Sequence, residues 1–340
     1  MRDALEEARR QVATLVGATP REIVFTSGGT EAINAAVWGA TRQRPGAPVL
    51  FAEVEHSAVR DASARLAPAE VLAVDTSARI DTDVLAARLR DTARAAPSLV
   101  HCQWANHEVG TLQPVHDVVR LCREAGVPVH VDAAAACGHV PLDLGALGAD
   151  LVSISAHKIG GVPGAGALVI RRGSRFEPLI VGGEQERARR AGLEAMPALL
   201  AFGAAAAALG AEGQRLLHEE ARHAASQTAA LVTAALDVAG VAVVGPQRAE
   251  DRLPSLLCLG VQGVEAEPVL IGLDRAGVAV HSGSACSSES IEPSPVLEAM
   301  GVDASHSLRI SVGWTTTDDD CDAFAREFSR VVADLRALRS

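Results

Sequence analysis

The chain has 340 residues, 48% hydrophobic but only 3% aromatic, so a sizeable core must be built mainly from Ala, Val, Leu and Ile. Its formal net charge of −11 argues against a general nucleic-acid or membrane-surface binder. The six cysteines form no CxxC pair, which argues against a zinc site or a disulfide framework; five lie among apolar residues, where we expect small core side chains.

The N-terminal sequence MRDALEEARR is charged and amphipathic, without the apolar core of a signal peptide. The longest apolar stretch starts at Pro197 and is shorter than the roughly 20 apolar residues that a bilayer span needs. We therefore expect a soluble, cytoplasmic protein with no membrane contact.

Short β-branched runs alternate with stretches of helical period over the first part of the chain. Strands are predicted at residues 23–26, 49–53, 71–74, 99–103, 129–132, 151–155 and 167–171. The apolar spacing of the stretches between them, such as DTDVLAARLRDTARAA, suits helices with one buried face. This alternation predicts an α/β fold with a mainly parallel, seven-stranded sheet and helices on both faces.

From residue 198 the pattern changes to a long Ala-rich helical region that reaches about residue 238. Short strands are predicted at 241–244 and 255–259, followed by a Gly/Ser-rich loop around Cys286 and a closing helix from Asp318. We therefore divide the chain into a large domain, residues 1–197, and a smaller C-terminal α+β domain, residues 198–340.

The first of three unusual strand ends is TSGGT, residues 26–30, where a strand runs into a helix. Small residues at a helix N-terminus expose backbone N–H groups, and Thr30 adds a hydroxyl, so Gly29 and Thr30 suit an anion such as phosphate. Taken alone, the same pattern is more often a plain glycine turn with a threonine cap.

The other two strand ends carry charged residues. Asp132 ends an apolar strand, where a carboxylate either caps the next helix or pairs with a positively charged ring nitrogen. Ser155, His157 and Lys158 end another strand before a Gly-rich loop. Burial and neighbouring cations lower the pKa of a lysine and make it a usable Schiff-base amine. The alternative is a solvated loop lysine, but Lys158 is the only lysine in the chain.

Ligand sites of such sheets lie at the carboxyl ends of the strands, where these residues are expected. An anion cradle, a carboxylate and a lysine offer partners for the phosphate, the pyridinium nitrogen and the aldehyde of pyridoxal 5'-phosphate (PLP). The combination is far more specific than any of its parts.

With these motifs the chain resembles a cysteine desulfurase of the NifS/IscS type, in the class V group of fold-type I PLP-dependent transferases, from about residue 5 to the end. The matching segments are PREIVFTSGGTEAIN, EVEHSAV, NHEVGTLQPV, VHVDA, SAHKIGG, GGEQERARRAG, SGSACSSESIEPSPVL and SLRISVGWTTT. The resemblance implies that Lys158 is the Schiff-base lysine, that Asp132 pairs with the pyridine nitrogen, and that His56 stacks on the ring.

Further roles follow from the same resemblance. It assigns Gly29, Thr30, Ser155 and His157 to the phosphate, His107 to the cofactor and substrate, Arg309 to the substrate carboxylate, and Cys286 to the nucleophile. The alternative for Cys286 is an unreactive surface thiol in a degenerate homologue. Without the family context, His56 reads as an ordinary surface histidine and Arg309 as a strand-edge partner in a salt bridge.

The implied reaction converts L-cysteine to L-alanine and leaves a persulfide on Cys286. The Gly/Ser-rich sequence HSGSACSSES gives this thiol the mobility that sulfur delivery needs. The resemblance further implies a homodimer and a sulfur-acceptor protein, either an iron-sulfur cluster assembly scaffold or a tRNA-thiolation enzyme, with no direct nucleic-acid contact. The alternatives are a PLP-dependent lyase or aminotransferase of the same fold, acting for example on selenocysteine or cystine, and an inactive sulfur-pathway scaffold.

Four departures from the family pattern affect the expected site. The second Asn of Asn-Asn-Glu-Ile-Gly is His107, a Gln that reaches the phenolic oxygen of the cofactor is Ala135, and a Thr that reaches the neighbouring subunit's phosphate is Leu193. The N-terminal Asp-x-x-Ala-Thr-Thr-Pro segment does not occur in this sequence. We expect either that the start lies upstream of Met1 or that the site is open on one side.

Overall fold

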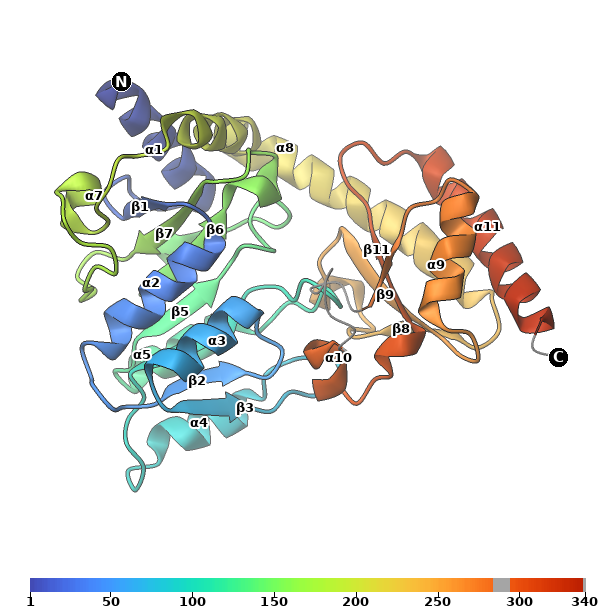
Figure 1. The fold of residues 1–340 in the computed structure, drawn as a ribbon, viewed down its shortest axis with the longest axis horizontal. Helices are drawn as coiled ribbons and strands as arrows, with labels where there is room; N and C mark the ends of the chain where they lie inside the picture. Colours follow the sequence, from blue (N-terminus) through green and yellow to red (C-terminus); the bar gives the residue numbers. More distant parts are fainter. Residues whose placement is uncertain (284–293, 339–340) are drawn as a thin grey trace. The chain divides into compact units, whose positions relative to one another are not determined.

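The structure is a computed structural model that describes residues 1–283 and 294–338 (Figure 1). The chain divides into two compact units. The first contains Met1–Ala73, Ile80–Trp104 and Gln113–His218, and the second contains Val74–Arg79, Ala105–Leu112 and Glu219–Ser340.

The first unit contains a seven-stranded sheet with its helices. Its helices are α1 Arg2–Val16, α2 Gly29–Thr41, α3 Ser57–Leu66, α4 Thr82–Arg90, α5 Val115–Glu124, α6 Leu144–Leu147, α7 Gln185–Ala188 and the N-terminal part of α8 Met196–Leu236. Its strands are β1 Ile23–Thr26, β2 Val49–Ala52, β3 Ala69–Leu72, β4 Leu99–Gln103, β5 Val129–Asp132, β6 Leu151–Ser155 and β7 Gly166–Ile170.

The strand order of this sheet is β1-β7-β6-β5-β4-β2-β3. Only β7 runs antiparallel to its neighbours, and the other six strands are parallel to one another. Helices α2 and α3 pack together on one face, and α4 and α5 pack together on the other (Figure 1). The predicted α/β fold with a mainly parallel, seven-stranded sheet is confirmed.

Burial explains why most strands could be located from the sequence. Every residue of six of the seven strands is buried, as expected for a sheet covered on both faces. The exception is the edge strand β3, which begins two residues before the predicted 71–74. Its side chains are partly exposed, and Val71 is exposed by 53%. The bounds of β3 are therefore set by its pairing with β2, in which Ala69 lies opposite Val49, and the apolar run in the sequence does not locate them.

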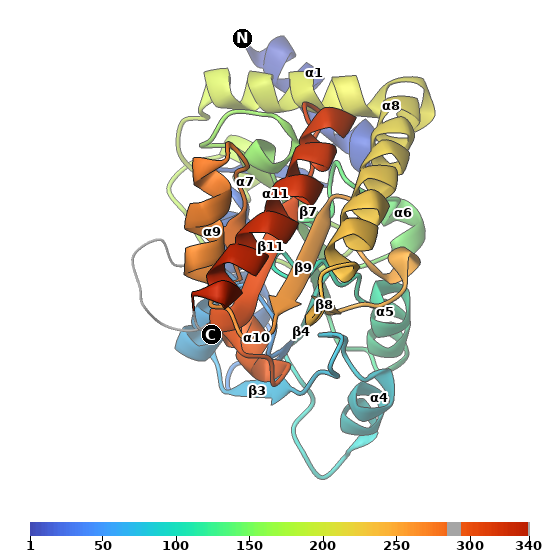
Figure 2. The ribbon, with the colours of Figure 1, turned by 90° about the vertical axis from the view of Figure 1, so that its right-hand side faces the viewer.

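The second unit contains a four-stranded antiparallel sheet of order β10-β11-β9-β8. Its strands are β8 Val241–Val244, β9 Leu256–Val261, β10 His281–Ser282 and β11 Ser307–Ser311, and its helices are the C-terminal part of α8, α9 Ala266–Arg275, α10 Pro295–Ala299 and α11 Asp318–Ala337. Figure 2 shows α9, α11 and this part of α8 over one face of the sheet. The predicted second α+β fold and the helix starting at Asp318 are therefore present.

The boundary between the units lies inside α8, between His218 and Glu219, and not after residue 197 as predicted. The reason is the close packing of the first half of α8 on α1. A Cβ atom on Gly203 would lie 2.6 Å from the Cα of Ala8, and the Gln214 side chain donates a hydrogen bond of 2.7 Å to the Leu15 carbonyl. Two short segments from the first part of the chain also belong to the second unit.

Among the residues that the structure describes, no single helix is long and apolar enough to cross a membrane. The two segments of α8, Met196–Gly210 and Gln214–Leu236, meet such a test only when taken together, and only by length and composition.

Two buried histidines lie side by side in the centre of the large sheet. His101 of β4 and His130 of β5 are register partners, and their Nδ1 atoms are 2.8 Å apart. Burial, and next the neighbouring His130, lowers the pKa of His101 well below its usual value. Burial also lowers the pKa of His130 to about 4, although the Asp132 carboxylate opposes this shift. The pair is therefore neutral in the folded protein at neutral pH.

This pair predicts a specific acid sensitivity. Below pH 6.5 the unfolded chain protonates both histidines while the folded chain does not, so the free energy of unfolding falls as the pH drops from 6.5 towards 4. Each histidine contributes about 1.4 kcal/mol per pH unit over this window. Urea unfolding of the wild type and of the double variant His101→Gln/His130→Gln at several pH values measures the difference in slope.

The exposed His223 provides the control for this experiment. His223→Gln should retain the pH slope of the wild type, and the double variant should have a shallower one. Equal slopes in all three proteins would contradict the assignment of acid sensitivity to the buried pair.

Candidate active site

The loop from β1 to α2 forms a cradle of small residues. Gly28 is the N-cap residue of α2 and Gly29 its first residue, so no side chain caps this helix end. A Cβ on Gly29 would lie 3.6 Å from the Cβ of Ser155, which places the cradle next to the end of β6. A Cβ on Gly166 would lie 2.6 Å from the Gly28 carbonyl carbon, so only glycine fits there. The alternative of a cap by Thr30 is wrong, because Thr30 lies inside the helix.

Sequence reasoning missed a carboxylate that binds the backbone of this loop, that of Glu31. Glu31, in the first turn of α2, accepts a hydrogen bond from the Ser27 backbone N–H (2.9 Å) and two from the Arg190 guanidinium (2.9 and 3.2 Å). Burial alone would raise the pKa of Glu31, but the bonds from Arg190 and Ser27 outweigh it and lower the pKa. Arg190 thus neutralises the only acidic residue in the first turn of α2.

Asp132 lies at the carboxyl end of β5 and is largely buried. Its Oδ1 atom accepts hydrogen bonds from the Ser153 hydroxyl (2.9 Å) and from the Ala134 backbone N–H (3.0 Å). No donor to Oδ2 occurs among the described residues, so Oδ2 is available to a ligand. The residues that follow form turns, and the alternative of a helix cap is therefore wrong.

Strand β6 runs into a short 3-10 helix, Ala156–Ile159, that carries His157 and Lys158. The Ser155 hydroxyl and the His157 Nδ1 atom are 2.9 Å apart. Partial burial, and next the charge of Lys158, lowers the pKa of His157. Ser155 and His157 therefore present a neutral pair of hydrogen-bonding groups beside the cradle, and the exposed Lys158 follows directly.

His139 is a second histidine near Lys158, and sequence reasoning missed it. Burial lowers its pKa first, and the positive charge of Lys158 lowers it further, although a hydrogen bond with the Lys158 backbone opposes both effects. The sequence offered no signal for His139, because it lies in a turn 19 positions before Lys158 with no motif of its own.

His56 lies four residues after β2 and caps α3. Its Nδ1 atom accepts a hydrogen bond of 3.1 Å from the Ala58 backbone N–H. In the neutral ring the proton is therefore on Nε2, and the backbone fixes the orientation of the ring.

The cradle follows β1, His56 follows β2, Asp132 is the last residue of β5, and Lys158 follows β6. These four strands are parallel, so their carboxyl ends lie at one edge of the sheet, where ligands of open α/β sheets bind. The structure therefore brings the predicted cofactor residues of the first unit to the same edge.

Two predicted substrate residues, His107 and Arg309, lie together in the second unit. Arg309 projects from β11, opposite Cys258 on β9 and His281 on β10. Its guanidinium donates a hydrogen bond of 3.3 Å to the His107 carbonyl, and the His107 Nε2 atom lies 3.4 Å from a carboxylate oxygen of Glu108. The predicted nucleophile, Cys286, lies outside the described residues.

The other cysteines are unsuited to nucleophilic chemistry. The five described ones are Cys102, Cys122, Cys137, Cys258 and Cys321, and all are free and buried. Burial is the main cause that raises the pKa of each thiol, to about 12 in Cys122, Cys137 and Cys258. Because the thiolate is the reactive form, these five are inert core side chains, as predicted.

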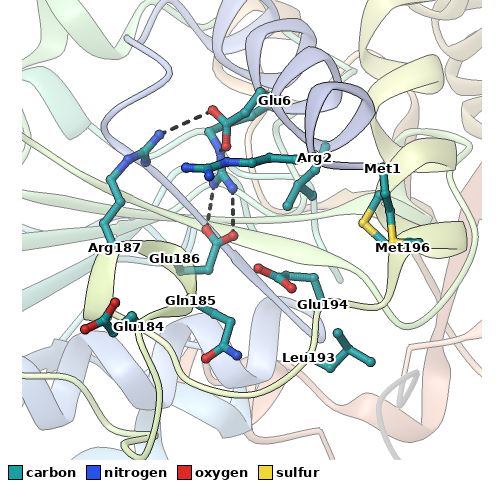
Figure 3. A pocket seen from close by; sticks show the side chains of 12 residues that line it. Met1, Arg2, Glu6, Glu184, Gln185, Glu186, Arg187, Leu193, Glu194 and Met196 are labelled. Carbon is teal, nitrogen blue, oxygen red and sulfur yellow. Dashed lines mark hydrogen bonds and ion pairs between the residues drawn. The ribbon is translucent and has the colours of Figure 1, made fainter.

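A cavity of about 810 Å³ lies in the first unit, between the start of α1 and the region of α7 (Figure 3). Beside it, Glu186 forms a bidentate ion pair with Arg9 (2.6 and 2.7 Å) and also accepts a hydrogen bond from the Phe25 backbone N–H. Glu186, Arg187 and Ala188 have left-handed φ angles of 47°, 60° and 59°, which are unfavourable for residues with a Cβ. The buried ion pair holds this strained turn in place.

This geometry predicts that Glu186→Gln destabilises the protein by about 3 kcal/mol, because it removes the buried carboxylate that binds Arg9 at two points and leaves this buried charge with only the more exposed Glu6 as ion-pair partner. Glu7→Gln, which breaks the exposed Glu7–Arg10 pair on the same helix, should cost less than about 1 kcal/mol. Chemical denaturation measures both changes. Similar losses in the two variants would show that the buried pair contributes no more than a surface pair.

The profile of the Aminotransferase class-V family matches residues 1–324. The chain belongs to this family. It is 37% identical to the cysteine desulfurase NifS of Azotobacter vinelandii, over 98% of this chain and 83% of the relative. It is 36% identical to the cysteine desulfurase IscS of Dictyoglomus turgidum, over 99% of this chain and 86% of the relative. A solved NifS-like protein from Rickettsia africae matches with a TM-score of 0.85 and 29% identity, over 98% of this chain and 88% of that one.

These matches confirm the resemblance and the fold type read from the motifs. Enzymes of the class-V aminotransferase family depend on PLP, and the residues of this chain fit that cofactor. The glycine cradle lies beside Ser155, and the uncapped N-terminus of α2 offers backbone N–H groups to a phosphate. Asp132 Oδ2 can accept a hydrogen bond from the ring nitrogen, and Lys158 is the only amine side chain that can bind the aldehyde.

Proposed function

We propose that this class-V aminotransferase family member is a cysteine desulfurase that removes sulfur from L-cysteine, releases L-alanine and keeps the sulfur as a persulfide on Cys286. The observation that carries the proposal is the position of the only lysine, Lys158, at the same sheet edge as the glycine cradle and Asp132. Whole-chain similarity to cysteine desulfurases supports the choice of substrate.

The bound cofactor would supply an electron sink for the substrate carbons. Asp132 Oδ2 would keep the ring nitrogen protonated, and the cradle with Ser155 and His157 would hold the phosphate. Lys158 Nζ would accept the proton from the substrate Cα and return a proton as alanine forms. His56, oriented through the Ala58 N–H, would lie against the ring.

In the sulfur transfer, the thiolate of Cys286 would attack the substrate sulfur. A bond forms between the two sulfur atoms, the Cβ–S bond of the substrate breaks, and Cβ takes up a proton. No external oxidant is needed, and a reductant is needed only to release the persulfide sulfur as sulfide. The five other cysteines, buried and with raised pKa values, leave Cys286 as the candidate for this step.

We further propose a homodimer, a cytoplasmic location and a sulfur acceptor that is an iron-sulfur scaffold or a tRNA-thiolation enzyme. The strongly exposed Val181 (74%) and Leu193 (85%), close to each other in the sequence of the first unit, support a second copy as partner. The free thiols support a reducing compartment. Size-exclusion chromatography with light scattering tests the dimer.

The function is tested by Cys286→Ala, which should retain the visible absorbance of the bound cofactor but lose release of sulfide and alanine from L-cysteine in the presence of a reductant. The expected loss exceeds about 100-fold, because the nucleophile itself is removed. Cys321→Ala, a buried thiol outside the proposed chemistry, is the control and should stay active. Full sulfide release by Cys286→Ala would favour the lyase alternative.

A further inference from the structure

The segment Ala105–Leu112 of the second unit contains a buried carboxylate that no part of the proposed chemistry uses. Asn106 is fully buried, and its side-chain oxygen accepts hydrogen bonds from the backbone N–H groups of Glu108 and Val109, both 2.9 Å long. The Asn106 backbone also bonds with Thr111 and Gly110. This closed turn fixes the direction of Glu108, whose exposure is only 2%.

The carboxylate of Glu108 has two partners from different parts of the sequence. Its Oε1 atom lies 3.4 Å from Nε2 of His107, and its Oε2 atom accepts a hydrogen bond from the Ser294 hydroxyl. Ser294 is buried and caps α10, where its oxygen accepts a bond of 3.2 Å from the Leu297 backbone N–H. The single hydroxyl proton is therefore committed to Glu108, and a hydrogen bond to a buried charged acceptor is a strong one.

The other boundary of the undescribed residues 284–293 is fixed to β11. The Gly283 backbone N–H donates a hydrogen bond of 2.7 Å to the Ser307 carbonyl. A Cβ on Gly283 would lie 2.7 Å from the Cβ of Ser307 and 2.8 Å from a methyl carbon of Leu297, so only glycine fits. Arg309 lies on the same strand, two residues after Ser307, and binds the His107 carbonyl.

Residues 283 and 294, which flank the part of the chain that contains Cys286, therefore belong to one bonded cluster with His107 and Arg309. Glu108 is the member that contacts both Ser294 and the His107 ring. Arg309 lies opposite Cys258 of β9 in the sheet.

We propose that Glu108 is a positioning residue, whose buried carboxylate fixes Ser294 and the His107 ring together and thereby holds the residue at which the described chain resumes after Cys286 in one bonded cluster with the substrate-binding residues His107 and Arg309. The proposal rests on the proposed function, because it concerns delivery of the Cys286 thiol to the substrate. An error of about 1 Å in the position of a reacting group can cost about 100-fold in rate.

The sharpest test uses Ser294→Ala, which removes the donor to Glu108 without touching His107 or Arg309. In the holoenzyme, single-turnover persulfide formation on Cys286, followed by alkylation and mass spectrometry, should slow by about 10-fold to 100-fold. The cofactor content should stay as in the wild type, because the glycine cradle, Asp132 and Lys158 belong to the first unit and Ser294 belongs to the second. Ser294→Thr retains a hydroxyl and should restore the rate.

Thr317→Ala is the matched control. It removes the N-cap of α11 in the same unit, a change that costs about 1 kcal/mol of stability, but it should not slow persulfide formation. Glu108→Gln should slow the transfer, and the double variant Glu108→Gln/Ser294→Ala should be little slower than the worse single variant, because both changes break one bond.

The outcomes separate this proposal from the proposed function. If the wild type forms no persulfide from L-cysteine, the desulfurase assignment fails. If the wild type forms the persulfide and Ser294→Ala forms it equally fast, or if Thr317→Ala is slowed as much as Ser294→Ala, the positioning role of Glu108 is wrong.

Discussion

The parallel alignment of six strands is the constraint on which the candidate site depends. Parallel strands present their carboxyl ends at a single edge, so residues that are far apart in the sequence arrive together when each follows a strand. The glycine cradle follows β1, His56 follows β2, Asp132 ends β5 and Lys158 follows β6. A single antiparallel strand, β7, lies between β1 and β6, and its Gly166 allows the cradle to approach closely.

The near absence of aromatic residues shapes how the core is packed. Helices approach one another through glycine and alanine, and a Cβ on Gly203 or Gly272 would lie 2.6 Å from an atom of another helix. Dispersion between closely packed small groups thereby replaces the large contact areas that aromatic rings give. The few rings are used at specific points, such as Phe25, over which the buried Arg9 guanidinium lies at 4.6 Å.

Buried or partly buried charged groups hold the segments that lack regular structure. Arg9 with Glu186 fixes the left-handed turn of α7, Arg190 with Glu31 links the following residues to the N-terminus of α2, and Glu108 holds Ser294. A charged group in such a place is stable only with a well-oriented partner, since the cost of removing it from water is high. Each pair therefore specifies one arrangement of its loop.

The sequence by itself determined most strands and the nature of the sheet, and it indicated the candidate cofactor residues. Buried strands appear as continuous apolar runs, and short motifs such as SAHKIGG carry their chemistry within a few residues. Even Ser294 could have been found, because Ser before Pro295 is a typical start of a helix. Its partner Glu108 could not have been found from the sequence, because it is 186 positions away. The same holds for the pair of Arg9 and Glu186, which are 177 positions apart. Only the tertiary structure decided these pairs, the bounds of β3 and the boundary inside α8, because each depends on how elements dock and not on local sequence preference.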